Sequence, residues 1–123
     1  MKHKQSLQEI IAEVTKDPIP HNLDAALEYL KSNVPESGKD RVKNCQDVAE
    51  FHFTTGMAMR NMWELWDKRS ILNHYFNSIG IFHADDMSAI IMESFKRILN
   101  GEPIELDKQV KFYKDYWAKH EKD

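Results

Sequence analysis

The sequence predicts an all-α fold, a compact single-domain bundle of about six helices, and two observations support this. Apolar residues return every three or four positions through nearly the whole chain, whereas the strict alternation that is typical of strands is weak. The four glycines and four prolines stand between these periodic segments and do not gather into linkers. At 123 residues the chain holds one domain, because a second one would be too small to form a core.

An N-terminal helix followed by a proline-containing linker is predicted for residues 1–20, and the main helical core for residues 22–120. The N-terminal helix ends where Pro18 and Pro20 prevent it from continuing. The first helix of the main core begins at Asn22, a good N-cap residue, and ends before Pro35. The apolar positions that predict the N-terminal helix are Leu7, Ile10, Ile11 and Val14.

The middle of the chain is predicted to form a loop and then the longest helix. Residues 36–44 are polar and predict a loop with one helical turn at residues 40–43. From Gln46 to Trp66, apolar residues recur at helical spacing and cover more than one face of the helix. This helix should therefore be central and buried on several sides.

Three further helices complete the predicted bundle. Residues 71–79 form a short helix that ends at Gly80, where glycine suits the C-cap. The next helix follows His83 and closes at Asn100-Gly101, because Pro103 prevents it from restarting. The last helix is predicted for residues 107–120.

Composition and charge narrow the function classes. The net charge of −3 and the absence of a basic block make nucleic acid a poor candidate for the partner. No stretch approaches the roughly 18 apolar residues that span a bilayer, so we expect no membrane partner. The basic N-terminus leads into an amphipathic segment, and the cytoplasm is the simplest compartment. Cys45 is the single cysteine, which excludes an intramolecular disulfide and a cysteine metal cluster.

A candidate polar cluster begins on the predicted central helix, where His52, Gly56 and Arg60 recur every four residues and share one face. Glycine within a helix costs about 1 kcal/mol relative to alanine, so its presence needs a reason. One interpretation is a polar groove in which a ligand or partner approaches the backbone between His52 and Arg60. The favoured interpretation is a tight helix crossing, with both side chains hydrogen-bonded to neighbouring helices.

The remaining candidates of this cluster are His83, Asp85 and Asp86, which come just before the fifth helix. A histidine and two carboxylates could bind a metal ion or form an acid–base pair. The same residues also fit a helix start, with His83 or Asp85 as the N-cap and Asp86 reaching back in a capping box. We favour capping. Since the chain has no HExxH motif, no P-loop and no nucleophile elbow, we predict no metal, no cofactor and no catalytic residue.

Aromatic residues provide a candidate interaction surface, because tryptophan and tyrosine dominate the binding energy of many interfaces. At helical spacing such residues more often fill a core. Trp117 is the best outward candidate, since nothing is certain to cover one face of a terminal helix. The residues of this candidate surface are Trp63, Trp66, Tyr113, Tyr116 and Trp117.

Four sequence strings resemble a small family of uncharacterised bacterial and phage-associated helical domains. They are FHFTTGM from residue 51, RNMWELW from residue 60, FHADDMS from residue 82 and LNGEPI from residue 99. The resemblance covers about residues 22–117, and it implies a helical domain with no assigned role or catalytic residues. The family often has proline where this chain has Ala84.

Three hypotheses of function remain open. The leading one is a non-enzymatic module that binds another macromolecule, most simply a protein, with immunity and anti-defence proteins as an analogy. The second is a small metal-dependent or acid–base hydrolase that brings the polar cluster into one cleft. The third is a self-associating structural module, a homodimer that pairs through the last helix and Trp117.

Overall fold

The computed structural model describes residues 19–120, and over this range the fold is all-α. Six α-helices and one short 3-10 helix make up the described range, which contains no strand. The N-terminal helix predicted within residues 1–20 lies almost entirely outside it. The elements are α2 (Leu23–Asn33), α3 (Glu36–Asn44), η1 (Val48–Phe51), α4 (Thr55–Met62), α5 (Ile71–Ser78), α6 (Ala84–Leu99) and α7 (Leu106–His120).

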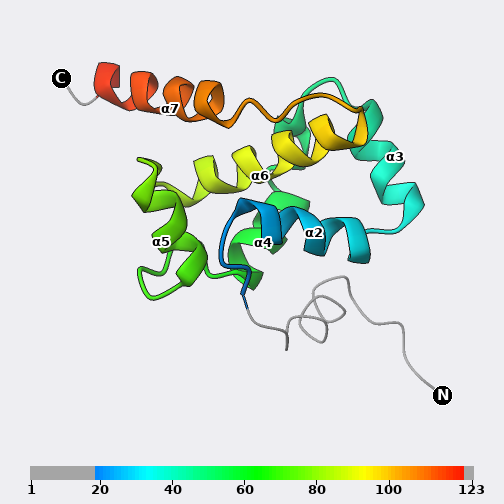
Figure 1. Ribbon diagram of the computed structural model, residues 1–123, viewed down its shortest axis with the longest axis horizontal. Helices are drawn as coiled ribbons and strands as arrows, with labels where there is room; N and C mark the ends of the chain where they lie inside the picture. Colours follow the sequence, from blue (N-terminus) through cyan, green and yellow to red (C-terminus); the bar gives the residue numbers. More distant parts are fainter. Residues whose placement is uncertain (1–18, 121–123) are drawn as a thin grey trace.

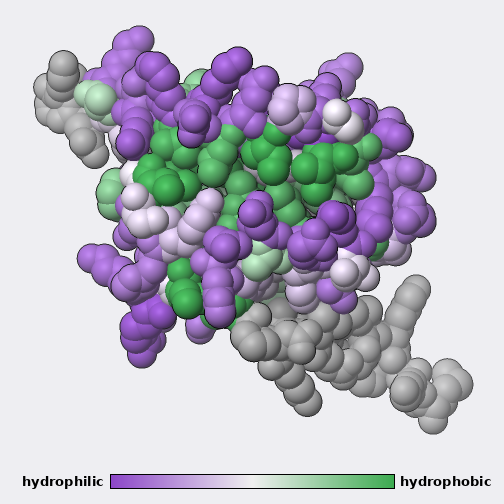
Figure 2. Space-filling view, viewed as in Figure 1, coloured by the Kyte–Doolittle hydropathy of each residue, from purple (hydrophilic) through white to green (hydrophobic). Residues whose placement is uncertain are grey.

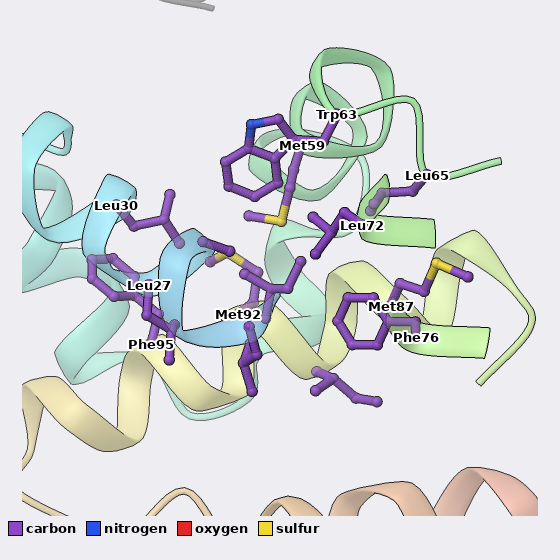
Figure 3. Packing of buried hydrophobic residues seen from close by; sticks show 14 of the residues in the cluster. Leu27, Leu30, Met59, Trp63, Leu65, Leu72, Phe76, Met87, Met92 and Phe95 are labelled. Carbon is purple, nitrogen blue, oxygen red and sulfur yellow. The ribbon is translucent and has the colours of Figure 1, made fainter. Parts of the chain in front are cut away.

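Helix α6 is the centre of the fold. It crosses the middle of the molecule, with α7 along one side and α2 and α4 on the other (Figure 1), and every other described helix packs against it. Its inner stripe is completely or almost completely buried and meets side chains from α2, α4 and α5 (Figure 3). That stripe consists of Met87, Ile90, Ile91, Met92 and Phe95. Within residues 19–120, none of the helices combines the length and apolar character that crossing a bilayer requires.

The predicted ends of several helices are confirmed. The side chain of Asn22 accepts a hydrogen bond from the Ala25 amide at the start of α2, as an N-cap should. Gly80 and Gly101 follow α5 and α6 with φ of +92° and +72°. At both sites the amide of the glycine and the amide of the next residue donate to carbonyls in the last turn of the helix, which is the Schellman arrangement that favours glycine.

The loop predicted for residues 36–44 is wrong, because this segment forms helix α3. It lacks an apolar stripe, and Val42 is its one buried residue. Glu36 suits the first turn of a helix, and Arg41 and Lys43 suit the last turn, so charge favours the helix where periodicity does not. The helix is then fixed at its end by Asn100 and Lys96, whose side chains donate hydrogen bonds to the carbonyls of Lys43 and Cys45.

The single long helix predicted from Gln46 to Trp66 is also wrong. The segment divides into η1, a turn over residues 52–54, α4 and a second turn over residues 63–66. Thr54 has φ −117° and ψ −97°, outside the helical region, and Glu64 has a left-handed φ of +50°. The break turns Leu65 into the core, where it is fully buried. The apolar side chains of residues 46–66 are therefore divided between the short helices η1 and α4 and the turns that follow them.

The neighbouring tryptophans Trp63 and Trp66 give a direct test of this break. Trp63 is 1% exposed and packs edge-on against Tyr29, whereas Trp66 is 58% exposed. We expect Trp63→Ala to lower the free energy of unfolding by about 3–5 kcal/mol, and Trp66→Ala to change it by less than about 0.5 kcal/mol. Urea denaturation measures both. Equal losses would mean that the two side chains lie in similar environments, as on an unbroken buried helix.

Candidate functional site

The Arg60 side chain forms the best-defined part of the predicted polar cluster. It is 7% exposed, and its guanidinium donates hydrogen bonds to Ser88 Oγ and to the carbonyl of His52, both at 2.8 Å. Its Nε lies 3.4 Å from Oδ1 of Asp85, whose side chain is largely exposed. These contacts join α4 to the turn after η1 and to the start of α6. The guanidinium therefore acts as a tie between three segments.

Gly56 makes room for this tie. A Cβ atom at this position would lie 3.0 Å from the carbonyl oxygen of Phe51 and 3.1 Å from Nη1 of Arg60. Both distances are tighter than ordinary van der Waals contact, and the carbonyl belongs to the backbone, which cannot move aside freely. The helical spacing of Gly56 and Arg60 thus has a structural reason. His52 enters the arrangement through its carbonyl oxygen, not through its ring.

A small cavity of about 180 Å³ lies next to the Arg60 tie. Its walls come from η1, α4, α6 and α7, so residues far apart in sequence meet there. Its lining includes the aromatic residues Phe51, His52 and Tyr113, the acidic Asp47, and Ser88, whose hydroxyl accepts a hydrogen bond from Arg60. The further lining residues are Val48, Ala49, Gly56, Ala89 and Met92.

His83 and Asp86 form a second, separate arrangement, with Trp117 of α7. The rings of His83 and Trp117 stack with centroids 3.8 Å apart and planes inclined by 20°. The indole N–H of Trp117 donates a hydrogen bond of 2.8 Å to Asp86 Oδ2. His83 is the N-cap residue of α6, but its side chain caps nothing. The predicted capping box does not form, because both side chains are turned to α7 instead.

Burial raises the pKa of the Asp86 carboxyl above its usual value, and the neighbouring Asp85 adds to this effect. The hydrogen bond from Trp117 and the charge of His83 act in the opposite direction without cancelling it. The folded protein therefore disfavours the ionised form of this carboxyl.

The candidate aromatic surface does not form as one patch. Trp63 does not belong to the candidate surface, because its side chain is buried in the core beside the break in the predicted long helix. Trp117, the expected outward residue, is half-buried against His83 and Asp86. Tyr113 is also half-buried, and burial with nearby carboxylates raises its pKa to about 12. Trp66 and Tyr116 are the exposed members, at 58% and 45%.

Phe53 and Met57 are surface residues that sequence reasoning missed. Phe53 is 76% exposed and its ring meets the His52 ring edge-on at 4.6 Å, next to the cavity. Met57, 39% exposed, follows the cavity-lining Gly56. Both fall among the apolar residues of the long helix predicted from Gln46 to Trp66, for which we expect burial on several sides. The two β-branched threonines after Phe53, which weaken helix formation, were the available signal of the turn.

The chemistry of the site is limited by how its polar groups are already used. The Arg60 donors serve Ser88, His52 and Asp85, and Asp86 accepts from Trp117. Within residues 19–120, no three histidine, cysteine, aspartate or glutamate side chains gather closely enough to hold a metal ion. The polar cluster thus separates into two sets of contacts at the start of α6, with a small cavity beside one of them.

Comparison with known families places the chain. The model of a domain of unknown function, DUF6794, matches residues 19–99. The chain belongs to this family. The matched span runs from just before α2 to the end of α6 and includes the Arg60 tie, whereas α7 with Tyr113 and Trp117 follows it. No curated protein and no solved structure is significantly similar to the chain.

Substitution of Arg60 tests the tie within this DUF6794 domain. We expect Arg60→Met to lower the free energy of unfolding by about 2–4 kcal/mol, because it removes the donor to the His52 carbonyl and to the buried Ser88 hydroxyl. Asp85→Asn should cost about 0.5 kcal/mol or less, since this ion pair is open to solvent on one side. Urea denaturation of both variants measures the difference. A larger loss for Asp85→Asn would show that the ion pair, and not the buried hydrogen bonds, holds the segments together.

Asp86 gives a pH-dependent prediction. Because its folded-state pKa lies above the unfolded value, the folded protein binds more protons here, and stability falls as pH rises through the folded pKa. Asp86→Asn keeps an oxygen for the Trp117 N–H and removes the charge. The variant should therefore gain stability relative to wild type at pH 7, and this gain should vanish below about pH 4. Thermal unfolding from pH 3 to 7 checks the sign, and a gain that grows on acidification would contradict it.

Proposed function

We propose that the protein is a non-enzymatic binding module for another protein, and that its contact surface surrounds the cavity beside the Arg60 tie. This contact surface consists of Phe53, Met57, His52 and Tyr113. The observation that carries the proposal is the exposure of Phe53. A phenylalanine ring that is 76% exposed beside a cavity contributes little to folding and is well placed to be buried by a partner.

The surroundings of Phe53 support this role. Phe53 lies in the turn between η1 and α4, and the carbonyl of the preceding residue is held by Arg60. The His52 ring supports the Phe53 ring from the side. A rigidly presented aromatic side chain loses little conformational entropy when a partner covers it, which favours binding. The exposed Met57 adds an adaptable apolar side chain to the same surface.

The engagement of the polar cluster supports binding rather than catalysis. A general acid or base must reach a substrate proton within hydrogen-bond distance, and a catalytic arginine needs donors to spare. Here each nitrogen of the Arg60 guanidinium contacts a protein oxygen, Asp86 accepts from Trp117, and one face of the His83 ring stacks on the same indole. A hydrolase would have to share these groups between their present contacts and a substrate.

For the biological setting, we propose an immunity or anti-defence role in the cytoplasm of a bacterium, or on behalf of a phage. The support is an analogy with small helical proteins of that kind. The genes adjacent to this one test the setting. A toxin or defence system among them fits the proposal, and a conserved metabolic operon contradicts it.

Capture experiments with matched variants test the contact surface. Phe53→Ala is compared with Phe112→Ala, which removes an equally large ring that is 64% exposed on α7. For a specific partner that wild type retains, Phe53→Ala should lower the affinity at least about tenfold, which is the effect of a single hot-spot side chain. Phe112→Ala should leave the affinity unchanged. The free energy of unfolding of both variants should lie within about 0.5 kcal/mol of the wild-type value, since neither ring is buried.

The pattern of retention decides the outcome. Loss with Phe112→Ala alone would place the contact surface on the outer face of α7 and contradict the proposal. Dimerisation that Phe112→Ala abolishes, measured by light scattering, would support the self-associating module instead.

A further inference from the structure

We propose that the cavity beside the Arg60 tie is the pocket for one lysine side chain of the protein partner. This inference rests on the proposed function and specifies the chemistry of its contact. The cavity is small, and its lining includes three aromatic residues and the acidic Asp47. Its volume and its lining both favour a long aliphatic stem that ends in an ammonium group.

The volume excludes most other occupants. Pockets for drug-sized ligands and cofactors measure roughly 300–1,000 Å³, whereas this cavity measures about 180 Å³. That space suits a single extended side chain. Met92, Ala89 and Val48 supply apolar surface for the methylene stem, as long cationic side chains prefer.

The walls suit a cation. The rings of Phe51 and Tyr113 line the cavity from opposite elements, η1 and α7. An ammonium group against the face of such a ring gains about 0.5–2 kcal/mol, depending on how far it is desolvated. Asp47 also lines the cavity, and in this proposal its carboxylate pairs with the ammonium. One of its oxygens already accepts from the Ala49 amide, which fixes the carboxylate in place.

Carboxylates act on Tyr113, a residue of the cavity lining. The Arg60 and Arg97 side chains are paired with Asp85 and Glu93. The Lys96 ammonium donates to the Cys45 carbonyl. Asp47, Asp86 and Glu93 all act on the Tyr113 hydroxyl, and each disfavours a second negative charge there. An anionic side chain would be repelled by the same groups.

Titration of the protein with three probes of similar size tests the inference. They are n-butylammonium, which reproduces the lysine side chain, n-butanol and butyrate. In nitrogen-15 correlation spectra, the ammonium should cause saturable shifts at the amides of Gly56, Ser88 and Ala89, which line the cavity. Butanol and butyrate should shift these amides far less at equal concentration.

Matched variants locate the charge. Asp47→Asn keeps an oxygen that can cap η1 and should weaken ammonium binding about two- to fivefold, the effect of a partly exposed ion pair. Asp107→Asn removes the same charge from a separate groove on α7 and should have no effect. Equal shifts by all three probes, no shifts at these amides, or an unchanged affinity of Asp47→Asn would each overturn the inference.

The two proposals fail separately. Phe53 lies outside the cavity lining, so Phe53→Ala should bind n-butylammonium as wild type does. A negative titration together with Phe53-dependent capture of a partner would reject the lysine pocket and keep the binding module. A positive titration with capture that ignores Phe53 would keep the lysine pocket and reject Phe53 as the centre of the contact surface.

Discussion

The guanidinium of Arg60 is the interaction on which the arrangement of the site depends. A buried cation is costly unless its donors are satisfied, and here they are satisfied by groups from two other segments. These contacts therefore fix the relative positions of the three segments and also contribute to the stability of the fold. The bond to the His52 carbonyl holds the turn between η1 and α4, and the bond to Ser88 sets that turn against α6. The exposed Phe53 lies in the turn that is held in this way, and the preceding His52 lines the cavity.

Helix α7 relates differently to the rest of the protein. It has no buried residue, and it lies along α6 with a band of apolar surface visible between α7 and α2 (Figure 2). Its firmest contacts are those of Trp117 with His83 and Asp86, and of Gln109 with Ser94. The DUF6794 match ends before it, yet Tyr113 completes the wall of the cavity. The core of the family thus supplies most of the cavity, and the added helix closes one side.

The all-α fold and several helix boundaries could be predicted because they depend on local signals. Asn22, Gly80 and Gly101 end or begin helices through hydrogen bonds within one turn, which the local sequence specifies. The division of the predicted long helix could not be predicted in this way. Helical periodicity continues through residues 52–54, and the break is stabilised by a bond from Arg60 to His52 and by the burial of Leu65. Such contacts are tertiary.

The candidate polar residues illustrate the same limit. Sequence spacing placed Gly56 and Arg60 together correctly, since four residues make one helical turn. It could not show that Asp86 would accept from a tryptophan 31 positions later, or that His83 would stack on the same ring. Burial of Trp63 and exposure of Phe53 depend likewise on the direction of α4 after the turn. The sequence identifies candidate polar and aromatic side chains, but the direction in which the chain carries them depends on tertiary contacts.

The stability of Gly56→Ala tests the role of the Arg60 tie most directly, because the two accounts of this glycine predict opposite signs. If Gly56 were an ordinary helical residue, alanine would raise the free energy of unfolding by about 0.5–1 kcal/mol. In the present account the new methyl group meets the Phe51 carbonyl and the Arg60 guanidinium, and stability falls. Urea denaturation that shows a loss agrees with the account. A gain in stability would contradict it.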